Sequence, residues 1–440
     1  MSQPNIPDTG LPRVVVVGGG FGGLAVVRAL LRSMMQVVLI DRNNYHLFQP
    51  LLYQVSTAGL EPESIAFPLR GIFRYSKDFH IRMGEASKIT PEKSILETSI
   101  GPIGYDYLVM ATGSDTNFFG MADIETHAIG MKSLVEAIGI RNYILRQFEQ
   151  ILLINDPGEI QSRLSFVVTG GGPTGVELSG AIAELKKHVL PRDYPELPIH
   201  QMTVYLVEAS SRLLASLSEQ SSRYALASLQ KLGVKVMLQT SVKGYDGNTL
   251  LLSSGETIRT HSLIWTAGVR GVPVPGLPGS SVLKNGRVQV NIYNQVEGFD
   301  HLFVVGDIAQ QVFDPRFPKG FPMVAQVAIQ QGRLAAKNIM RLQSRLPLIP
   351  FRYSDKGSMS TIGRNKAVAE TAGLRFSGFP AWLAWMGAHL VFLMGFRNKL
   401  IVFINWVYRY FNFDNGSRII FRRWVSPMDK PSQPGNEEVK

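Results

Sequence analysis

Residues 14–23 read VVVVGGGFGG, a run of valines that leads directly into the pattern Gly-x-Gly-x-x-Gly. Four consecutive β-branched residues without polar alternation predict a strand that is buried on both faces of a parallel sheet. Residues 24–33 then predict a helix, and residues 36–40 predict a second strand that ends at Asp41. A strand, a glycine loop and a helix in this order predict a βαβ unit that binds a dinucleotide.

The glycines of this loop have separate steric tasks. Gly18 permits the tight turn, Gly20 lets the backbone approach a pyrophosphate, and Gly23 lets the helix pack closely on the strand. The helix N-terminus faces the phosphates. Asp41 lies 23 residues after Gly18, where an acid can hydrogen-bond a ribose 2′-hydroxyl group. The alternative, a glycine-rich turn without a ligand, is disfavoured because strand, helix and acid fall in register.

The same pattern recurs later in the chain. Residues 165–169 (SFVVT) predict a strand, and residues 170–175 (GGGPTG) open a helix. The next strand, residues 203–207, ends at Glu208 after an insertion that carries three prolines. An acid at this strand end favours a free 2′-hydroxyl group and repels a 2′-phosphate, so we expect NADH rather than NADPH. Arg212, four residues further on, weakens that preference.

Two more strand ends complete the pattern. Residues 107–110 predict a strand that runs into Ala-Thr-Gly, and residues 302–305 predict one that runs into Gly306-Asp307. Together with the first glycine loop, these ends resemble the flavoprotein superfamily with two dinucleotide-binding domains. The resemblance implies that Asp307 binds the ribityl or pyrophosphate part of a flavin. Asp307 can also cap the helix that follows, and the two roles do not exclude each other.

The chain contains no cysteine, and this excludes some members of the superfamily. No disulfide, no Cys-ligated zinc or iron–sulfur cluster and no thiolate nucleophile can form. Disulfide reductases and sulfide:quinone oxidoreductases need catalytic cysteines, so both are excluded on chemistry alone. Ferredoxin reductases and respiratory NADH dehydrogenases remain.

Three longer stretches resemble type II, non-proton-pumping NADH:quinone dehydrogenases. They are residues 44–55 (NYHLFQPLLYQV), residues 111–120 (ATGSDTNFFG) and residues 325–331 (AQVAIQQ). The resemblance covers residues 12–425 in the family's order. It implies non-covalently bound FAD, NADH as the hydride donor, a membrane quinone as the acceptor, and no metal.

The resemblance also implies roles for four side chains. Gln326 and Gln330 are four residues apart on one helix face, where their amides would orient the quinone carbonyls; alternatively they cap neighbouring backbone. Glu177 would lie near the nicotinamide and the flavin ring and relay protons, or it only interacts favourably with the helix dipole. Lys399, between two C-terminal helices, matches a lysine near the quinone entrance.

These expectations assign the cofactor contacts as well. The candidate FAD contacts are Gly18, Gly20, Phe21, Gly22, Gly23, Asp41, Arg42, Ala111, Thr112, Gly113, Gly306, Asp307, Ala325 and Gln326. The candidate NADH contacts are Gly170, Gly172, Pro173, Thr174, Gly175, Glu177, Glu208 and Gly268.

The C-terminal segment combines aromatic and basic residues. No acid lies between Glu370 and Asp414, and four of the five tryptophans fall in the last 60 residues. Residues 371–425 hold seven Arg or Lys and one acid, a local net charge of +6. This is more than half of the net charge of +11 of the whole chain. Tryptophan favours membrane–water interfaces, and arginine suits anionic headgroups. We therefore expect residues 380–425 to bind an anionic lipid surface through amphipathic helices.

A helix from Ala381 would carry two stripes. The small residues on one stripe are Ala384, Gly387, Ala388, Val391 and Gly395, and the bulky residues on the other are Trp382, Trp385, His389, Phe392 and Phe396. We expect the small stripe to pack on the protein and the bulky stripe to enter the acyl boundary. The alternative is a buried helix pair at a dimer or domain interface. Both roles can coexist, and we expect a homodimer.

The sequence thus predicts an α/β protein with two Rossmann-like dinucleotide-binding domains and a C-terminal helical segment that binds membranes. We expect an FAD-binding domain formed by residues 10–125 and 290–375, with an NADH-binding domain at residues 126–289 between its parts. Residues 376–425 would form the membrane-associated helices, and residues 426–440 a disordered tail.

We expect a peripheral membrane protein on the cytoplasmic face of a bacterial inner membrane, because no segment is long and apolar enough to span a bilayer. A nucleic-acid partner is not expected, since the basic residues alternate with Trp and Phe runs. Two other functions stay open. One is an NAD(P)H oxidoreductase with a protein acceptor, similar to ferredoxin reductase or apoptosis-inducing factor. The other is a flavin-bearing membrane scaffold or redox sensor.

Overall fold

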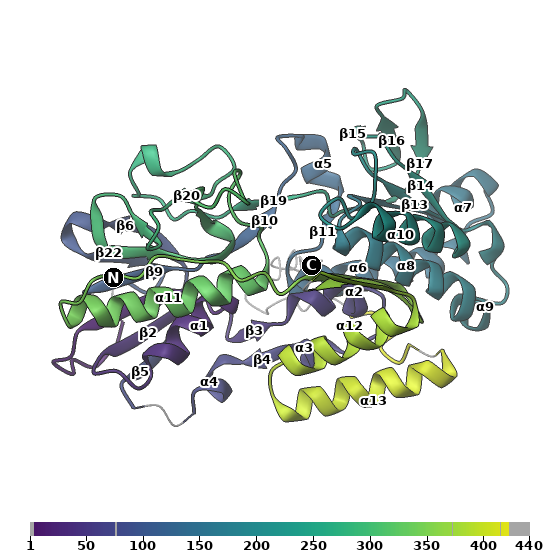
Figure 1. Ribbon diagram of the computed structural model, residues 1–440. Helices are drawn as coiled ribbons and strands as arrows, with labels where there is room; N and C mark the ends of the chain where they lie inside the picture. The colour runs from purple at the N-terminus through teal and green to yellow at the C-terminus, as the bar shows by residue number, and fades with distance from the viewer. Residues whose placement is uncertain (1–3, 75–76, 372, 414, 422–440) are drawn as a thin grey trace, which may run out of the picture.

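The computed structural model describes residues 4–74, 77–371, 373–413 and 415–421. Figure 1 shows two lobes, each built around a sheet, with two C-terminal helices side by side below them. The expected tail, residues 426–440, lies outside the described residues. So do Arg422, Arg423 and Trp424, which belong to the expected membrane segment.

The first sheet has six strands in the order β21-β22-β9-β1-β2-β5. Its central strand β1 (Arg13–Val17) pairs in parallel with β2 (Gln36–Asp41) and β9 (Tyr107–Met110). β22 (Phe299–Val304) pairs in parallel with β9, although it comes much later in the chain. The edge strands are β5 (Phe79–Met83) and β21 (Gln295–Val296). All four strands that the sequence predicted for this lobe are present.

The valines of β1 are buried on both faces of this sheet, as predicted. Val14 and Val16 belong to the apolar cluster under α1 (Phe21–Leu30) and α11 (Ala325–Gln343). Val15 and Val17 belong to a second cluster on the opposite face. Short strands cover that face, namely β6 (Ala86–Thr90), β7 (Ile95–Thr98), β8 (Ile103–Gly104), β20 (Val288–Gln289) and β23 (Ala309–Gln310).

The second sheet has five parallel strands in the order β11-β18-β12-β13-β14. In chain order they are β11 (Ile129–Gly130), β12 (Ser165–Thr169), β13 (Thr203–Val207), β14 (Val234–Met237) and β18 (Ser262–Trp265). One face packs on α6 (Leu134–Ile151), α8 (Pro173–His188) and α10 (Glu219–Lys231). The other face packs on α5 (Ala122–His127) and an antiparallel sheet of β15 (Val242–Tyr245), β16 (Thr249–Leu252) and β17 (Thr257–Arg259).

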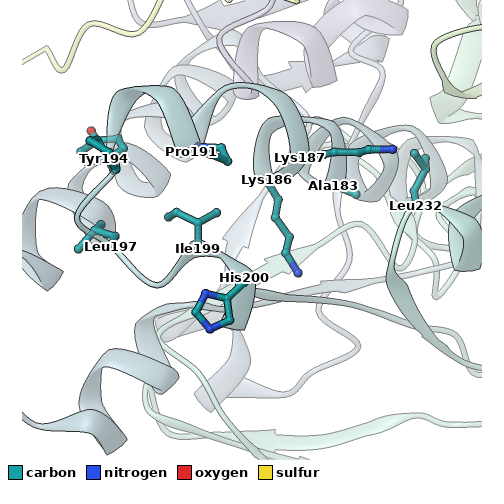
Figure 2. A pocket seen from close by; sticks show the side chains of 10 residues that line it. Ala183, Lys186, Lys187, Pro191, Tyr194, Leu197, Ile199, His200 and Leu232 are labelled. Carbon is teal, nitrogen blue, oxygen red and sulfur yellow. The ribbon is translucent and has the colours of Figure 1, made fainter.

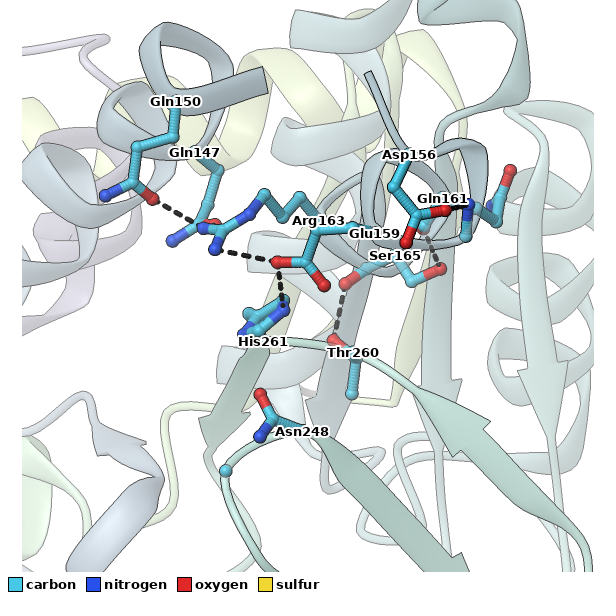
Figure 3. A network of polar contacts seen from close by, with 12 residues as sticks. Gln147, Gln150, Asp156, Glu159, Gln161, Arg163, Ser165, Asn248, Thr260 and His261 are labelled. Atoms are coloured by element: carbon cyan, nitrogen blue, oxygen red, sulfur yellow. Dashed lines mark hydrogen bonds and ion pairs between the residues drawn. The ribbon is translucent and has the colours of Figure 1, made fainter. Parts of the chain in front are cut away.

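A polar network closes the end of the second sheet that lies away from its glycine loop (Figure 3). Glu159, on α7 (Pro157–Arg163), lies 3.0 Å from His261 Nε2 and 2.8 Å from Arg163 Nη2. Arg163 also donates to Gln147 of α6. Burial alone would raise the pKa of Glu159, but the hydrogen bond from His261 and the charge of Arg163 hold that pKa below its usual value.

A third sheet joins the end of the first lobe to the second lobe. It consists of β24 (Ser358–Gly363), β25 (Lys366–Thr371) and β26 (Leu374–Ser377), all antiparallel. Glu370 of β25 accepts hydrogen bonds at the N-terminus of α10, from the backbone and hydroxyl of Ser218 and from the Ser221 hydroxyl. Residues 358–377 therefore pack on helices of the second lobe. The boundary at residue 375 stays a prediction.

Shorter elements connect these layers. They are β3 (Tyr45–Leu47), β4 (Ala66–Pro68), β10 (Ser114–Thr116), β19 (Val269–Gly271), α2 (Leu52–Ser56), α3 (Pro62–Ile65), α4 (Leu69–Ile72), α9 (Leu190–Asp193) and the 3₁₀ turns η1 (Gln49–Leu51), η2 (Pro91–Lys93), η3 (Ile199–Gln201), η4 (Gly279–Ser281) and η5 (Gly306–Ile308). β10 pairs antiparallel with β19, and this pair bridges the two lobes at the centre of the molecule (Figure 1).

The C-terminal helices α12 (Phe379–Phe392) and α13 (Phe396–Asn412) form a hairpin below both lobes (Figure 1). None of the described helices is both long enough and apolar enough to cross a bilayer. The outer side of the hairpin exposes large apolar residues, which we call the hairpin surface: Phe379, Leu383, Val391, Phe392, Phe396, Leu400, Phe403, Ile404, Val407, Tyr408 and Phe411. Phe392 and Phe396 of the expected bulky stripe are 64% and 82% exposed.

The expected orientation of the rest of α12 is wrong. Trp385 is only 2% exposed and packs against Tyr53 and Trp406, whereas Ala384 and Gly387 face outward. Burial of an indole ring removes far more apolar area from water than burial of a methyl group. The large ring therefore takes the protein side of the helix, and the small residues do not.

Hydrogen bonds also attach α13 to residues 54–63. Trp406 Nε1 donates to Gln54 Oε1 over 2.8 Å, and Asn405 Nδ2 donates to Glu61 Oε2 over 2.8 Å. Asn398 Nδ2 donates to the carbonyl of Glu63 over 3.1 Å. The inner side of the hairpin is thus a specific protein interface, while the hairpin surface has no covering element among the described residues.

The contact between α8 and β24 allows no side chain at Gly180. A Cβ there would come closer than 3.0 Å to the backbone carbonyl oxygen of Ile362. We expect Gly180→Ala to lower the free energy of unfolding by about 1–3 kcal/mol and to reduce the thermal midpoint by several degrees, measured by circular dichroism.

The matched control is Gly139→Ala on the exposed side of α6, where a Cβ meets nothing within 4 Å. This change should be neutral or stabilising by up to about 1 kcal/mol, because alanine is the better helix former. Equal midpoints for the two variants would contradict the proposed contact.

Candidate functional site

The two glycine loops have the same construction. Each follows the central strand of a parallel sheet and opens a helix, α1 in the first lobe and α8 in the second. Gly18 and Gly170, at the start of the loops, have φ angles of +104° and +98°, a region that glycine adopts without steric cost. A Cβ on Gly23 or Gly175 would come closer than 3.0 Å to the carbonyl oxygen of the first glycine in its own loop.

Each predicted acid reaches the middle of its glycine loop. Asp41 Oδ2 accepts a hydrogen bond of 2.5 Å from the Gly19 N–H, and Glu208 Oε2 accepts one from the Gly171 N–H. The other oxygen of Glu208 accepts from the Ser210 N–H over 2.6 Å. Burial raises the pKa of Asp41 above its usual value. The two βαβ units thus repeat one another down to this contact.

The space in front of both loops suits a pyrophosphate. A Cβ on Gly20 or on Gly172, the N-caps of α1 and α8, would meet no atom within 4 Å. The first-turn backbone N–H groups of these helices are therefore accessible from that side, at the positive end of each helix dipole. A Cβ on Gly113 likewise meets nothing within 4 Å. These openings fit two dinucleotides, one in each lobe.

Asp307 lies where the two lobes meet. Its Oδ2 accepts a hydrogen bond of 2.5 Å from the Ser114 hydroxyl and lies 3.4 Å from Lys132 Nζ. Gly306, just before it, donates its N–H to Oε1 of the buried Gln331 over 2.8 Å. Sequence reasoning assigned no role to Ser114, Lys132 or Gln331. Gln331 belongs to the stretch 325–331 quoted above. The helical periodicity of that stretch, which places Gln331 on the inner face of α11, is the one sequence signal that could have revealed it.

The two candidate quinone glutamines both pair with backbone. Gln326 donates to the Gly357 carbonyl over 3.0 Å and accepts from the Lys356 N–H over 2.9 Å. Gln330 donates to the Ser354 carbonyl over 2.9 Å and accepts from the Ser354 N–H over 3.0 Å. This is the capping geometry that we gave as the alternative. Each amide still has a second N–H and a second lone pair, so the quinone role stays a prediction.

Glu177 is buried on α8, with 9% of its surface exposed. Its Oε1 accepts a hydrogen bond of 3.3 Å from the Thr361 N–H of β24. Burial raises the pKa of this carboxyl to about 8, even though the bonds from Thr361 and Ser360 act in the opposite direction. At neutral pH the group is therefore largely protonated and can donate a proton.

Lys399 closes the corner of the helical hairpin. Its Nζ donates to the Val391 carbonyl over 2.8 Å at the end of α12, where a cation is favoured by the helix dipole. Gly268, at the end of β18, lies against the Phe119 ring, and Arg42 is exposed beside Asp41. The structure thus brings the loop glycines and acids together, while Lys399 and Arg42 lie at the periphery.

A chain of aromatic rings, which sequence reasoning missed, connects the first glycine loop to the hairpin. Phe21 lies 5.0 Å from His46 and 6.0 Å from Phe48, measured between ring centroids, and Phe48 lies 6.0 Å from His389. His389 stacks on Trp385 at 4.1 Å. Burial lowers the pKa of both histidines to about 4, so both rings are neutral at pH 7.

Known proteins are similar to this chain in sequence and in fold. The family described as pyridine nucleotide-disulphide oxidoreductase matches residues 12–332. The type II NADH:quinone oxidoreductase NdhA of Mycobacterium tuberculosis is 35% identical, over 97% of this chain and 94% of its own. A second protein of that organism, the type II NADH:quinone oxidoreductase Ndh, is 36% identical over 93% of this chain and 90% of its own.

Solved structures agree on the fold. NDH2 of Plasmodium falciparum in complex with NADH has a TM-score of 0.84 and covers 93% of this chain and 100% of its own, at 18% sequence identity. The sulfide:quinone oxidoreductase of Aquifex aeolicus has a TM-score of 0.69 and covers 91% of this chain and 95% of its own, at 20% identity. The chain therefore belongs to the pyridine nucleotide-disulphide oxidoreductase family and, within it, to the type II NADH:quinone oxidoreductases.

Proposed function

We propose that this protein transfers hydride from NADH to FAD and then two electrons to a membrane quinone, without pumping protons. The observation that carries this proposal is the repeated glycine loop with its acid, in a chain that has no cysteine. FAD, when bound, accepts the hydride and passes on two electrons, so that step needs no acid–base triad from the protein. The residues of the chain would hold the cofactors, orient the substrates and supply protons to the quinone.

The first lobe would hold FAD and the second NADH. The loop of residues 18–23 would cradle the FAD pyrophosphate, Asp41 its ribose and Asp307 its ribityl or pyrophosphate part. The loop of residues 170–175 and Glu208 would do the same for NADH. The carboxylate of Glu208, held by two N–H donors, supports preference for a free 2′-hydroxyl group. Alignment of the reacting atoms to within ~3.5 Å is the main contribution of such a site.

Glu177 and the glutamines would serve the quinone. Glu177 holds its proton at neutral pH in a buried position, which suits a donor to a quinone that becomes a quinol. Gln326 and Gln330 are fixed by the backbone of residues 354–357, so their remaining N–H groups are preorganised to orient a carbonyl. Lys399 would stand near the quinone entrance.

The hairpin surface would place the protein on its lipid-soluble substrate. It exposes a contiguous series of large apolar residues on α12 and α13, and Arg397 and Lys399 at the corner between the helices add positive charge that suits anionic headgroups. We place the protein peripherally on the cytoplasmic face of a bacterial inner membrane. A homodimer, formed through part of the same apolar surface, belongs to this proposal.

The visible spectrum tests the main proposal. We expect purified protein to show flavin absorbance that NADH bleaches and a water-soluble ubiquinone analogue restores. Ferredoxin should not restore it at a comparable rate, because the proposed acceptor is a quinone.

A failure of NADH to bleach the flavin would overturn the proposal. Faster reoxidation by ferredoxin would favour the protein-acceptor alternative, and slow reoxidation by every quinone would favour the scaffold or sensor alternative.

The raised pKa of Glu177 predicts a pH dependence. The carboxyl keeps its proton below about pH 8 and loses it above, so flavin reoxidation by quinone should slow as pH rises through that value. Glu177→Gln should reduce the reoxidation rate roughly a hundredfold, the scale of a lost general acid, and should remove this pH dependence. Stopped-flow absorbance after prior reduction by NADH measures both effects.

The amide keeps the shape of the side chain, so circular dichroism and flavin content of the variant should match those of the unmodified protein. An unchanged pH profile in Glu177→Gln would show that another group supplies the proton.

Charge on the hairpin surface should release the protein from membranes. We expect Phe392→Glu/Phe396→Glu to reduce sedimentation with anionic vesicles at least tenfold, because two large apolar contacts become charged. Leu153→Glu, at a side chain that is 85% exposed on the second lobe, is the matched control and should sediment like the unmodified protein. Equal loss in both variants, or in neither, would contradict the assigned surface.

A further inference from the structure

A pocket of about 410 Å³ lies at the C-terminal end of α8, away from both glycine loops (Figure 2). Lys186 and Lys187 of α8 line one side, and Tyr194, Pro195 and His200 lie around the others. The volume is in the range of pockets that hold small organic ligands. α8 begins at Pro173, so the lining residues Ala183 and Lys187 lie about 15 Å and about 21 Å along the helix from the loop that opens it.

The pocket exists because of the insertion in the second βαβ unit. The connection from α8 to β13 spans residues 189–202 and forms α9 and η3 instead of returning directly to the sheet. Pro191 and Pro195, both in this connection, line the pocket, and each fixes its own φ angle. Dinucleotide binding occurs at the opposite end of α8 and makes no use of this wall.

The polar part of the pocket lining is basic. Lys186, Lys187 and His200 line it, and no carboxylate does. Figure 2 shows the Lys186 side chain extending toward the segment that carries His200, where its Nζ donates to the Met202 carbonyl. Burial, and to a smaller extent the charge of nearby Lys235, lowers the pKa of Lys186. Lysines at a helix C-terminus interact favourably with the helix dipole, but that interaction requires neither a cavity nor His200.

The remaining wall is apolar. Leu197, Ile199 and Leu232 line it together with the ring of Tyr194, and Ile199 is 5% exposed. Cationic groups on one side and apolar side chains on the other complement a molecule with an anionic head and an apolar body. We propose that this pocket binds a small organic anion, a phosphate or carboxylate carried on a flat or short apolar group.

Two sources of such an anion are compatible with the position of the pocket. Arg192 of α9 donates to the Asn412 carbonyl over 3.4 Å, at the end of α13. Asp193 pairs with Arg418 at 2.6 Å, and His188 stacks on Phe413 at 4.0 Å. Residues next to the pocket lining are thus joined to the end of α13, the helix that carries most of the hairpin surface. The anion is either a soluble phosphate or carboxylate, or the headgroup of an anionic lipid.

The test uses the full-length, flavin-loaded protein and 1-naphthyl phosphate as the probe, in isothermal titration calorimetry with NAD⁺ in excess to fill the dinucleotide site. We expect saturable binding that is at least tenfold tighter than that of inorganic phosphate or 1-naphthol alone. Lys187→Glu should weaken it roughly tenfold, because an attraction is replaced by a repulsion. Lys88→Glu, an exposed lysine on β6, is the matched charge control and should bind like the unmodified protein.

Circular dichroism and flavin content establish that both variants are folded. Absence of saturable binding, or equal affinities in Lys187→Glu and Lys88→Glu, would overturn the proposal. Displacement of the probe by vesicles of equal parts phosphatidylglycerol and phosphatidylcholine, but not by pure phosphatidylcholine, would support the site with a lipid headgroup as its ligand. Saturable, Lys187-dependent binding that neither vesicle displaces would support it with a soluble anion.

Discussion

The close approach of each helix to the turn that precedes it is the constraint on which the rest of the structure depends. In both lobes a side chain on the last glycine of the loop is excluded by the carbonyl oxygen of the first, Gly18 for Gly23 and Gly170 for Gly175. This contact fixes the helix N-terminus at the end of the central strand. The acid on the neighbouring strand then reaches the middle N–H of the loop. A positive helix end, an open approach and a ribose acceptor therefore arise together.

Contacts between the lobes turn two such units into one site. β10 and β19 extend from the ends of β9 and β18 and pair with each other, so the two sheets are joined next to their loops. Lys132, which follows the first strand of the second lobe, reaches Asp307 of the first. Because the chain has no cysteine, electrons pass between the two nucleotides without a thiol intermediate.

The features that the sequence predicted well are local ones. Valine runs, glycine spacing and an acid at a strand end all act within about 40 residues, so the residue pattern alone was enough to place both βαβ units. Partners that meet across long distances could not be predicted in this way. Ser114 and Gln331 hold Asp307 and Gly306 through contacts that depend on the whole first sheet. The inverted face of α12 has the same origin, since Tyr53 and Trp406, far apart in the chain, decide which side buries Trp385.

The division of the first sheet between distant parts of the chain has a consequence for biosynthesis. The five strands of the second sheet all lie within residues 129–265, whereas the first sheet needs β22 at residues 299–304. Chains emerge from the ribosome N-terminus first and fold unit by unit. The lobe that begins second can therefore complete its sheet before the lobe that begins first. Tyr53 also waits, because Trp385 and Trp406, its partners in the core, are translated long after it.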